Sequence, residues 1–135
     1  MKNEVAHILV VDDSPTILKS YCDLLIKKGY RVTACETGED AIRSFIGNDF
    51  DLVLTDIMLP GMSGLNLLKL MKESKPYIDV IVISGNTSSF TTIKALRYGA
   101  YDYLVKPIDD EVILYNVVER TLEKKGLAAE SAPGN

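Results

Sequence analysis

The sequence predicts an α/β domain with five parallel strands, and two observations carry this prediction. Short apolar runs rich in Val, Ile and Leu alternate with longer amphipathic stretches, which is the pattern of buried parallel strands followed by helices. The chain has 135 residues, enough for one domain that needs no cross-links. Strict alternation of strands and helices implies right-handed crossovers, with helices on both faces of one sheet. We expect a (βα)5 doubly wound sheet with the order 2-1-3-4-5, the commonest arrangement of five strands.

Each expected element is a short segment bounded by turn residues or by a change of hydrophobic period. The expected strands are His7–Val11, Tyr30–Ala34, Leu52–Thr55, Val80–Ile83 and Tyr103–Val105. The expected helices are Pro15–Lys28, Gly38–Ile46, Leu65–Glu73, Phe90–Tyr98 and Asp110–Lys125.

Several helix boundaries carry their own start or stop signals. Ser14 followed by Pro15 indicates an N-cap with proline in the first turn, and Gly29 ends the same helix. Thr37 with Asp40 three residues later resembles a capping box, although Glu is the commoner partner. Each signal supports a boundary that the periodicity had already indicated.

The last helix and the residues after it set the domain boundary. Residues 109–111 are Asp-Asp-Glu, and negative charge is favoured at the positive end of the helix dipole. Residues 126–135 contain Ala, Ser, Pro and Gly without an apolar period. We expect one domain over residues 1–125, and a flexible tail or the start of a linker to an unseen effector over residues 126–135.

Composition excludes several classes of protein. The net charge of −4 and the pI of about 5.0 argue against nucleic-acid binding by this domain, because phosphate contacts need Lys and Arg. Two cysteines, Cys22 and Cys35, make no disulfide framework and are expected to be buried thiols. No run is long enough to span a membrane, and Ile8–Val11 is too short for a signal-peptide core. We expect a cytoplasmic protein with no membrane partner.

Acidic residues end the first and third expected strands. Asp12 and Asp13 follow the first strand and Asp56 follows the third, and these strands are neighbours in the expected order. Ligands of open parallel sheets bind outside the carboxyl ends of the strands, where the strand order reverses. Like charges this close need a cation, and an all-oxygen ligand set suits Mg²⁺. The alternative for Asp12 and Asp13 is turn and N-cap chemistry before the first helix.

Two more residues are expected at the same edge of the sheet. Lys106 follows the fifth strand and precedes Pro107, and its ammonium could neutralise an oxygen anion in the acidic crevice; a solvated lysine is the alternative. Ser84 ends the fourth strand beside Gly85, where it could equally be a turn serine. The single histidine, His7, begins a strand, so a zinc site is not expected.

Together these residues resemble the receiver domain of two-component response regulators, whose fold is flavodoxin-like. The resemblance covers about residues 5–125, and the order and spacing of four segments make it specific. The segments are Ile8-Leu9-Val10-Val11-Asp12-Asp13, Leu54-Thr55-Asp56-Ile57-Met58-Leu59-Pro60-Gly61-Met62-Ser63-Gly64, Val82-Ile83-Ser84-Gly85 and Gly99-Ala100-Tyr101-Asp102-Tyr103-Leu104-Val105-Lys106-Pro107.

The resemblance implies a role for each residue of the acidic cluster. Asp56 is similar to the phosphoacceptor, which takes a phosphoryl group from a partner histidine kinase. Asp13, Asp56 and the backbone carbonyl of Met58 are similar to the ligands of Mg²⁺, with Asp12 holding the ion partly through water. Lys106 is similar to the lysine that binds the phosphoryl group.

The resemblance also implies an output. Ser84 and Tyr103 are similar to the switch hydroxyl and switch aromatic, which change the surface of helix 4, strand 5 and helix 5. A half-exposed strand aromatic is the alternative for Tyr103. Met58 and Asn86 stand where relatives tune the lifetime of the phosphoryl group. We expect control of a transcriptional output through an attached or separate effector.

Helices 4 and 5 also offer a surface for a homodimer. The candidate contacts there could equally belong to the core: Ile93, Leu96, Val117 and Val118.

Three other functions remain as alternatives. A phosphohydrolase of the haloacid-dehalogenase type would carry a second Asp where Met58 stands, so we expect no enzyme beyond phosphorylation and dephosphorylation of the domain itself. A flavin or nucleotide binder would need a phosphate-binding loop where Asp12 and Asp13 stand. A pure interaction module usually lacks one of the acids or the lysine, and this chain keeps all of them.

Overall fold

A five-stranded parallel sheet forms the centre of the computed structural model, which describes residues 5–85, 88–108 and 110–127. The order β2-β1-β3-β4-β5 confirms the predicted order, and every neighbouring pair is parallel. The strands are β1 (His7–Val11), β2 (Arg31–Cys35), β3 (Leu52–Asp56), β4 (Asp79–Ser84) and β5 (Asp102–Val105).

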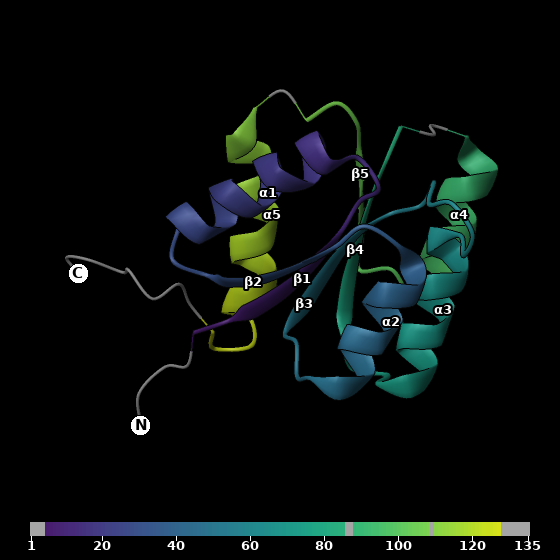
Figure 1. Ribbon diagram of the computed structural model, residues 1–135, viewed down its shortest axis with the longest axis horizontal. Coiled ribbons are helices and arrows are strands. Elements are labelled where there is room, and N and C mark those ends of the chain that lie inside the picture. The colour runs from purple at the N-terminus through teal and green to yellow at the C-terminus, as the bar shows by residue number, and fades with distance from the viewer. Residues whose placement is uncertain (1–4, 86–87, 109, 128–135) are drawn as a thin grey trace.

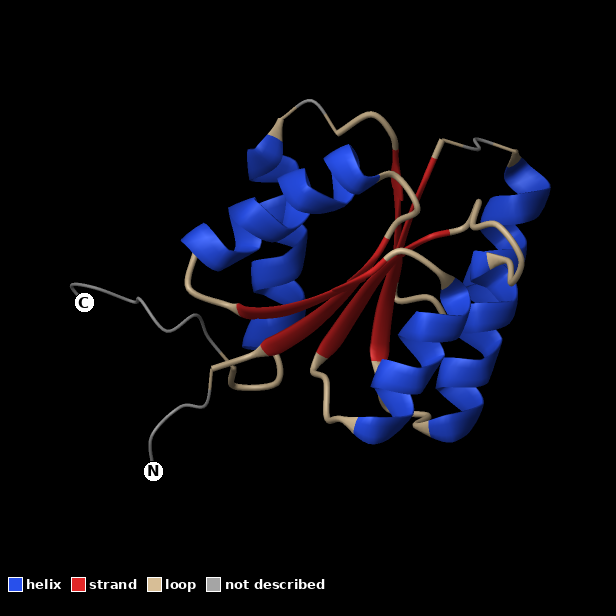
Figure 2. Cartoon of the chain, viewed as in Figure 1, coloured by secondary structure: helices blue, strands red, loops and turns tan. Residues whose placement is uncertain are grey.

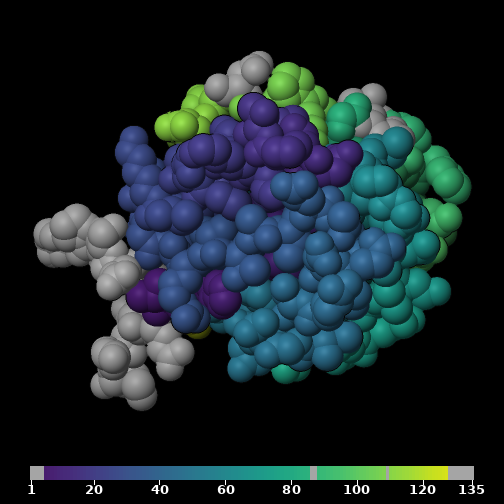
Figure 3. Space-filling model, viewed as in Figure 1, coloured from purple at the N-terminus to yellow at the C-terminus, as the bar shows by residue number. Residues whose placement is uncertain are grey.

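Five helices cover the two faces of the sheet, as the alternation of elements predicts. The helices α1 and α5 lie on one face, and α2, α3 and α4 lie on the other (Figures 1 and 2). Figure 3 shows the side of the molecule where α1 and α2 lie. The helices are α1 (Pro15–Lys27), α2 (Gly38–Gly47), α3 (Gly64–Ser74), α4 (Ser89–Arg97) and α5 (Glu111–Glu123).

The sheet separates two apolar clusters. Alternate residues of the buried strands point to opposite faces, so that Leu9 and Val53 join one cluster while Ile8 and Leu52 join the other. The first cluster packs against α2 and α3, and the second packs against α1 and α5. These two layers hold the strand ends in fixed positions relative to one another.

Side-chain caps fix the start of each helix. The Ser14 hydroxyl accepts from the Ile17 N–H at 3.3 Å, and the Thr37 hydroxyl accepts from the Asp40 N–H at 3.1 Å, which confirms both predicted N-caps. Asp110 caps α5 by accepting from the Val112 N–H at 2.9 Å. Asp110 was expected inside that helix, and its capping bond excludes it because an N-cap keeps extended backbone angles.

The end of α5 also differs from its expected position. The helix ends at Glu123 rather than Lys125, since Gly126 adopts a φ of 75°. The Gly126 N–H donates to the Glu123 carbonyl, and the Leu127 N–H donates to the Leu122 carbonyl. This pair of bonds is a Schellman motif, and Leu127 packs against the cluster that contains Leu122.

Some expectations concern exposure rather than secondary structure. Ile93 and Leu96 are exposed, whereas Val117 and Val118 are buried in the core and cannot be dimer contacts. Among the described residues, no helix combines the length and the apolar character needed to cross a membrane. Residues 128–135 of the expected tail lie outside the described residues.

Candidate functional site

The predicted acidic cluster lies at the carboxyl ends of β1 and β3. The two strands are hydrogen-bonded neighbours, with Val11 opposite Thr55, so the residues that follow them meet at one edge. Asp12 and Asp56 are buried, with exposures of 2% and 5%, whereas Asp13 is exposed. One carboxylate oxygen from each of Asp12, Asp13 and Asp56 lies within 4.8 Å of the others. The structure therefore brings together the three acids that the sequence singled out.

Lys106 reaches this cluster from the end of β5. Its Nζ lies 2.8 Å from Asp12 Oδ2 and 2.7 Å from Asp56 Oδ2. The Lys106 N–H donates to the Ser84 carbonyl at 2.9 Å, so the lysine is fixed to the end of β4 while its side chain extends toward β3 and β1. Lys106 is thus an ion-paired residue of the crevice rather than a solvated lysine.

The two ion pairs change the pKa of Lys106. Burial lowers the pKa of the ammonium, because the charged form loses water. The hydrogen bonds and charges of Asp12 and Asp56 outweigh burial, so the pKa of Lys106 is raised above its ordinary value of 10.5. The lysine is therefore a fixed positive charge at neutral pH.

Backbone groups orient the two buried carboxylates. The Ser14 N–H donates to Asp12 Oδ1 at 2.9 Å, and the Met58 N–H donates to Asp56 Oδ1 at 3.0 Å. Each buried carboxylate therefore has one oxygen on a backbone N–H and the other on the Lys106 ammonium. This arrangement holds both groups in one rotamer before any ligand arrives.

Gly64 contributes to the site, although no feature of the sequence pattern indicated a role for it. A Cβ at this position would lie 2.1 Å from the Asp56 carbonyl oxygen and 2.5 Å from the Ile57 Cα. The Gly64 N–H donates to the Ile57 carbonyl at 2.8 Å. The first residue of α3 is therefore pressed against the backbone of the phosphoacceptor candidate, and only glycine fits there.

Tyr21 of α1 is a second residue that the sequence analysis missed. Burial raises the pKa of its phenol, Lys106 lowers it, and the charges of Asp12 and Asp56 raise it further. Its side chain is half-buried and lines a small hollow with Ile108. Its helical period marks it as a core residue, so nothing in the sequence distinguishes it from a packing residue.

The charges of the crevice suit a divalent cation. Three carboxylates and one ammonium leave a formal charge of −2 within it. Oxygens that bind the same Mg²⁺ lie about 2.1 Å from the ion, so opposite ligands are about 4.2 Å apart. The three aspartate oxygens lie within 4.8 Å of one another, which is close to that distance. The described residues thus fit a magnesium ion.

The switch candidates lie on β4 and β5, the strands that follow β3 in the sheet. Ser84 is fully buried at the end of β4, and Tyr103 of β5 is half-buried against the cluster on the α2 and α3 face. Met58 is 62% exposed as a residue, while its backbone N–H donates to Asp56 Oδ1. Asn86, expected to influence phosphoryl lifetime, lies outside the described residues.

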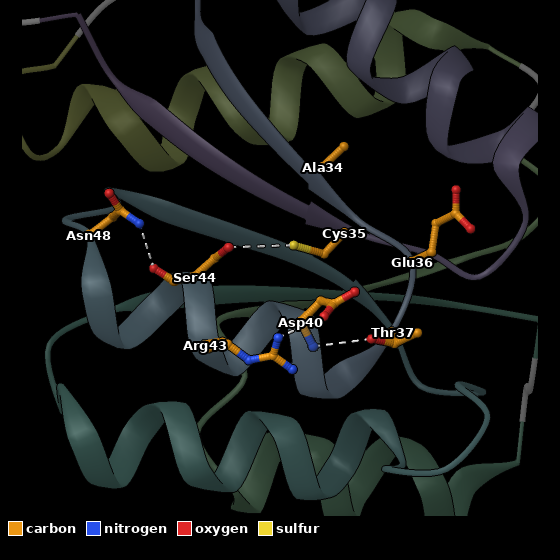
Figure 4. A pocket seen from close by; sticks show the side chains of 8 residues that line it. All are labelled: Ala34, Cys35, Glu36, Thr37, Asp40, Arg43, Ser44 and Asn48. Carbon is orange, nitrogen blue, oxygen red and sulfur yellow. Dashed lines mark hydrogen bonds and ion pairs between the residues drawn. The ribbon is translucent and has the colours of Figure 1, made fainter.

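A separate hollow of about 700 Å³ lies between the end of β2 and α2 (Figure 4). Its charged side chains include Asp40 and Arg43, which pair with each other at 3.2 Å. Cys35 Sγ lies 3.7 Å from the Ser44 hydroxyl, and burial raises the pKa of the thiol. With Glu36 also in its lining, this hollow carries a formal charge of −1, which is smaller than the charge at the ends of β1 and β3.

Comparison with known proteins agrees with this geometry. The family model of the response regulator receiver domain matches residues 8–119. The chain therefore belongs to the receiver domains of two-component response regulators. The transcriptional regulatory protein GlrR of Escherichia coli is 30% identical over 130 residues, which cover 96% of this chain and 29% of that protein. DltR of Streptococcus agalactiae is 33% identical over 91% of this chain and 55% of its own length.

Solved structures confirm the fold. A CheY-like receiver domain protein from Methanospirillum hungatei has a TM-score of 0.84 and 30% identity, covering 91% of this chain and 98% of that one. TrrA from Thermotoga maritima, solved in complex with Mg²⁺ and BeF, has a TM-score of 0.78 and 31% identity, covering 87% and 100%. This chain spans about half or less of the curated relatives described above.

Proposed function

We propose that this receiver domain accepts a phosphoryl group on Asp56 from a partner histidine kinase in a reaction that depends on Mg²⁺. One observation carries the proposal: Asp56 is buried in a crevice of charge −2, with the Lys106 ammonium 2.7 Å from its Oδ2. A carboxylate attacks phosphorus poorly because two anions repel each other. The site must therefore supply positive charge and alignment rather than a base.

The residues divide the chemistry between them. An Asp56 oxygen forms the new bond to phosphorus, while the bond from phosphorus to the donor nitrogen breaks and its electron pair returns to the imidazole. Asp13, Asp56, the Met58 carbonyl and, through water, Asp12 would hold Mg²⁺, which supplies positive charge to the attacking and phosphoryl oxygens together. Lys106 donates to another phosphoryl oxygen.

Ser84 and Tyr103 connect the site to a surface. The Ser84 hydroxyl would donate to a phosphoryl oxygen and move inward, and Tyr103 would turn into the space it leaves. The surface of α4, β5 and α5 would change for an effector with a transcriptional output. The exposed Leu96 of α4 leaves room for a homodimer through α4 and α5.

The domain would not catalyse reactions of substrates other than its own phosphoryl group and the phosphodonor. It would catalyse its own phosphorylation. It would also catalyse its own dephosphorylation, in which a water in line with the Asp56–phosphorus bond hydrolyses the aspartyl phosphate. The proposed location is the cytoplasm, where a kinase partner would supply the phosphoryl group, and no nucleic acid or membrane would bind to this domain.

Labelling with a small acyl phosphate tests the acceptor. The protein with acetyl phosphate and Mg²⁺ should gain one phosphoryl group by intact mass, and a chelator should prevent the gain. Asp56→Asn should abolish labelling, whereas the matched variant Asp23→Asn, on the exposed face of α1, should label normally. Undiminished labelling of Asp56→Asn would identify a different acceptor.

A further inference from the structure

The helix α4 carries a hollow on one of its faces. The hollow has a volume of about 440 Å³, and we call it the α4 groove; it is lined by Phe90, Ile93, Lys94, Arg97 and Tyr98. These positions follow the helical spacing i, i+3, i+4, i+7 and i+8, so they form one stripe. Phe90 is 72% exposed and Ile93 is 51% exposed, which is unusual for side chains of this size.

Positive charge surrounds the apolar part of the α4 groove. The Lys94 ammonium lies 5.4 Å from the centre of the Phe90 ring and 5.9 Å from the Tyr98 ring. Lys69 of the neighbouring helix α3 lies 5.9 Å from the Tyr98 ring. The Tyr98 ring is therefore within cation–π distance of ammonium groups from both helices, which lie side by side in Figure 1.

These cations have no acidic partners in the part of the chain that the structure describes. The ion pairs found there involve other lysines and arginines, and none includes Lys69, Lys94 or Arg97. The sequence of α4, SFTTIKALR, contains no acid. In a chain of net charge −4, the α4 groove is a local positive surface with exposed apolar side chains.

We propose that the α4 groove binds an acidic amphipathic helix of a partner protein. The apolar side chains of that helix would cover the exposed Phe90 ring, the half-buried Tyr98 ring and Ile93. Its carboxylates would face the three cations. Residues 90–98 extend for about 12 Å along a helix axis, which matches two turns of a bound helix. The proposal goes beyond phosphorylation, because the α4 groove exists in the unphosphorylated structure.

Two other occupants fit the surface less well. A second copy bound across a two-fold axis would place each cation near its own counterpart, and the α4 groove contains no acid to receive it. A nucleic acid would need a larger basic surface than a protein with a pI of about 5.0 offers. Charge complementarity therefore favours an acidic protein segment.

Two synthetic peptides of about 15 residues, a length at which isolated helices begin to form, provide the probe. The acidic peptide has Leu at i, i+3, i+4 and i+7 with Glu at the flanking positions, and the basic peptide has Lys in place of every Glu. Binding to the whole unphosphorylated 135-residue protein is followed by backbone amide NMR shifts and by anisotropy of the labelled peptide. The acidic peptide should shift amides of α3 and α4, and the basic peptide should not bind.

Charge and apolar variants separate the two parts of the surface. Lys94→Glu with Arg97→Glu should weaken binding at least about tenfold, since two favourable charge contacts become repulsive. The matched control, Lys27→Glu with Arg31→Glu, changes the same charge on an exposed surface far from α4 and should bind as the parent does. Phe90→Ser should also weaken binding, whereas Tyr77→Ser, which removes another exposed ring, should not.

Several results would overturn the proposal. Equal binding of the acidic and basic peptides would exclude charge recognition, and amide shifts confined to other elements would exclude the α4 groove. Unchanged affinity of both α4 variants would do the same. Sedimentation that shows a dimer of the parent and a monomer of Phe90→Ser would assign the surface to a second copy instead.

Discussion

The two ends of the sheet use the same residue types with different results. At the amino end, Lys124 and Lys125 both lie near Asp79 Oδ2, at 3.1 Å and 3.6 Å, and Lys125 also donates to the Asp51 carbonyl at 2.9 Å. Asp51 itself accepts from the His7 N–H at 2.8 Å. The Asp79 carboxylate therefore meets both ammonium groups, and the formal charges of Asp51, Asp79, Lys124 and Lys125 sum to zero, so the amino end is electrically balanced.

The carboxyl end has three carboxylates and a single ammonium. Asp12 and Asp56 share Lys106, while no ion pair between described residues includes Asp13, which faces solvent. The contrast shows that aspartate and lysine at a strand end do not by themselves make a site. The excess of negative charge, held in place by burial, is what a divalent cation can neutralise.

Removal of the Lys106 ammonium should cause the largest change in the free energy of unfolding. Lys106→Met leaves two buried carboxylates without their cation and should lower the free energy of unfolding by about 3 kcal/mol. Urea unfolding measures the change, and Mg²⁺ should restore more stability to the variant than to the parent. At the balanced end, Lys125→Met should cost less than about 1 kcal/mol. Equal losses at the two ends would show that charge excess is not the difference.

A methyl group at Gly64 should distort the site at the carboxyl end of the sheet through a steric clash, without any change of charge. Gly64→Ala forces a Cβ to within 2.1 Å of the Asp56 carbonyl oxygen, so the backbone must shift. We expect a loss of about 2 to 3 kcal/mol in urea unfolding, together with weaker Mg²⁺ binding. Gly47→Ala is the matched control, because its Cβ would meet nothing within 4 Å. A Gly64→Ala variant as stable as this control would mean that α3 is free to move away from Asp56.

Alkaline pH should weaken the carboxyl end by a smaller amount. The pKa of Lys106 is raised in the folded state, so its stabilising contribution is complete below its unfolded pKa near 10.5 and is lost as the pH rises through the folded pKa. The pKa values of Tyr21 and Tyr30 are also raised by burial, so the free energy of unfolding falls further in this pH range because the unfolded state loses these protons first. The difference between the parent and Lys106→Met therefore isolates the lysine, and it should shrink above pH 10.5.

Neutralisation of an acid at the amino end should have the smallest effect. Asp79→Asn removes the carboxylate near Lys124 and Lys125, and we expect a loss of at most about 1 kcal/mol. Mg²⁺ affinity, measured by titration calorimetry, should stay unchanged. A weakened magnesium affinity would mean that the two ends of the sheet are coupled through β4.

Sequence reasoning predicted what depends on strand order and missed what depends on side-chain direction. Val, Ile and Leu runs identify the strands, and the strand order places Asp12 beside Asp56 before any coordinates are known. The predicted position of Lys106 opposite the acids is confirmed. That its ammonium pairs with Asp12 and Asp56 rather than with Asp13 depends on sheet twist and side-chain rotamers.

Element ends and close approaches were predicted less well. Tyr30 was placed in β2, but the strand begins at Arg31 and includes Cys35, because register with β1 rather than hydrophobicity decides its ends. Gly64 stands in the matched motif, yet only the position of the Asp56 carbonyl shows why it must lack a side chain. Periodicity describes one element at a time and contains no information on such contacts between elements.

The hydrogen bonds of Lys106 determine how many further oxygen ligands its ammonium group can bind. An ammonium group carries three N–H donors, and the described residues take up two of them, at Asp12 and Asp56. Because no third acceptor is found among the described residues, an incoming oxygen could accept from the remaining donor without displacing either carboxylate. Lys106 Nζ can therefore bind a ligand oxygen while it keeps its hydrogen bonds to Asp12 and Asp56.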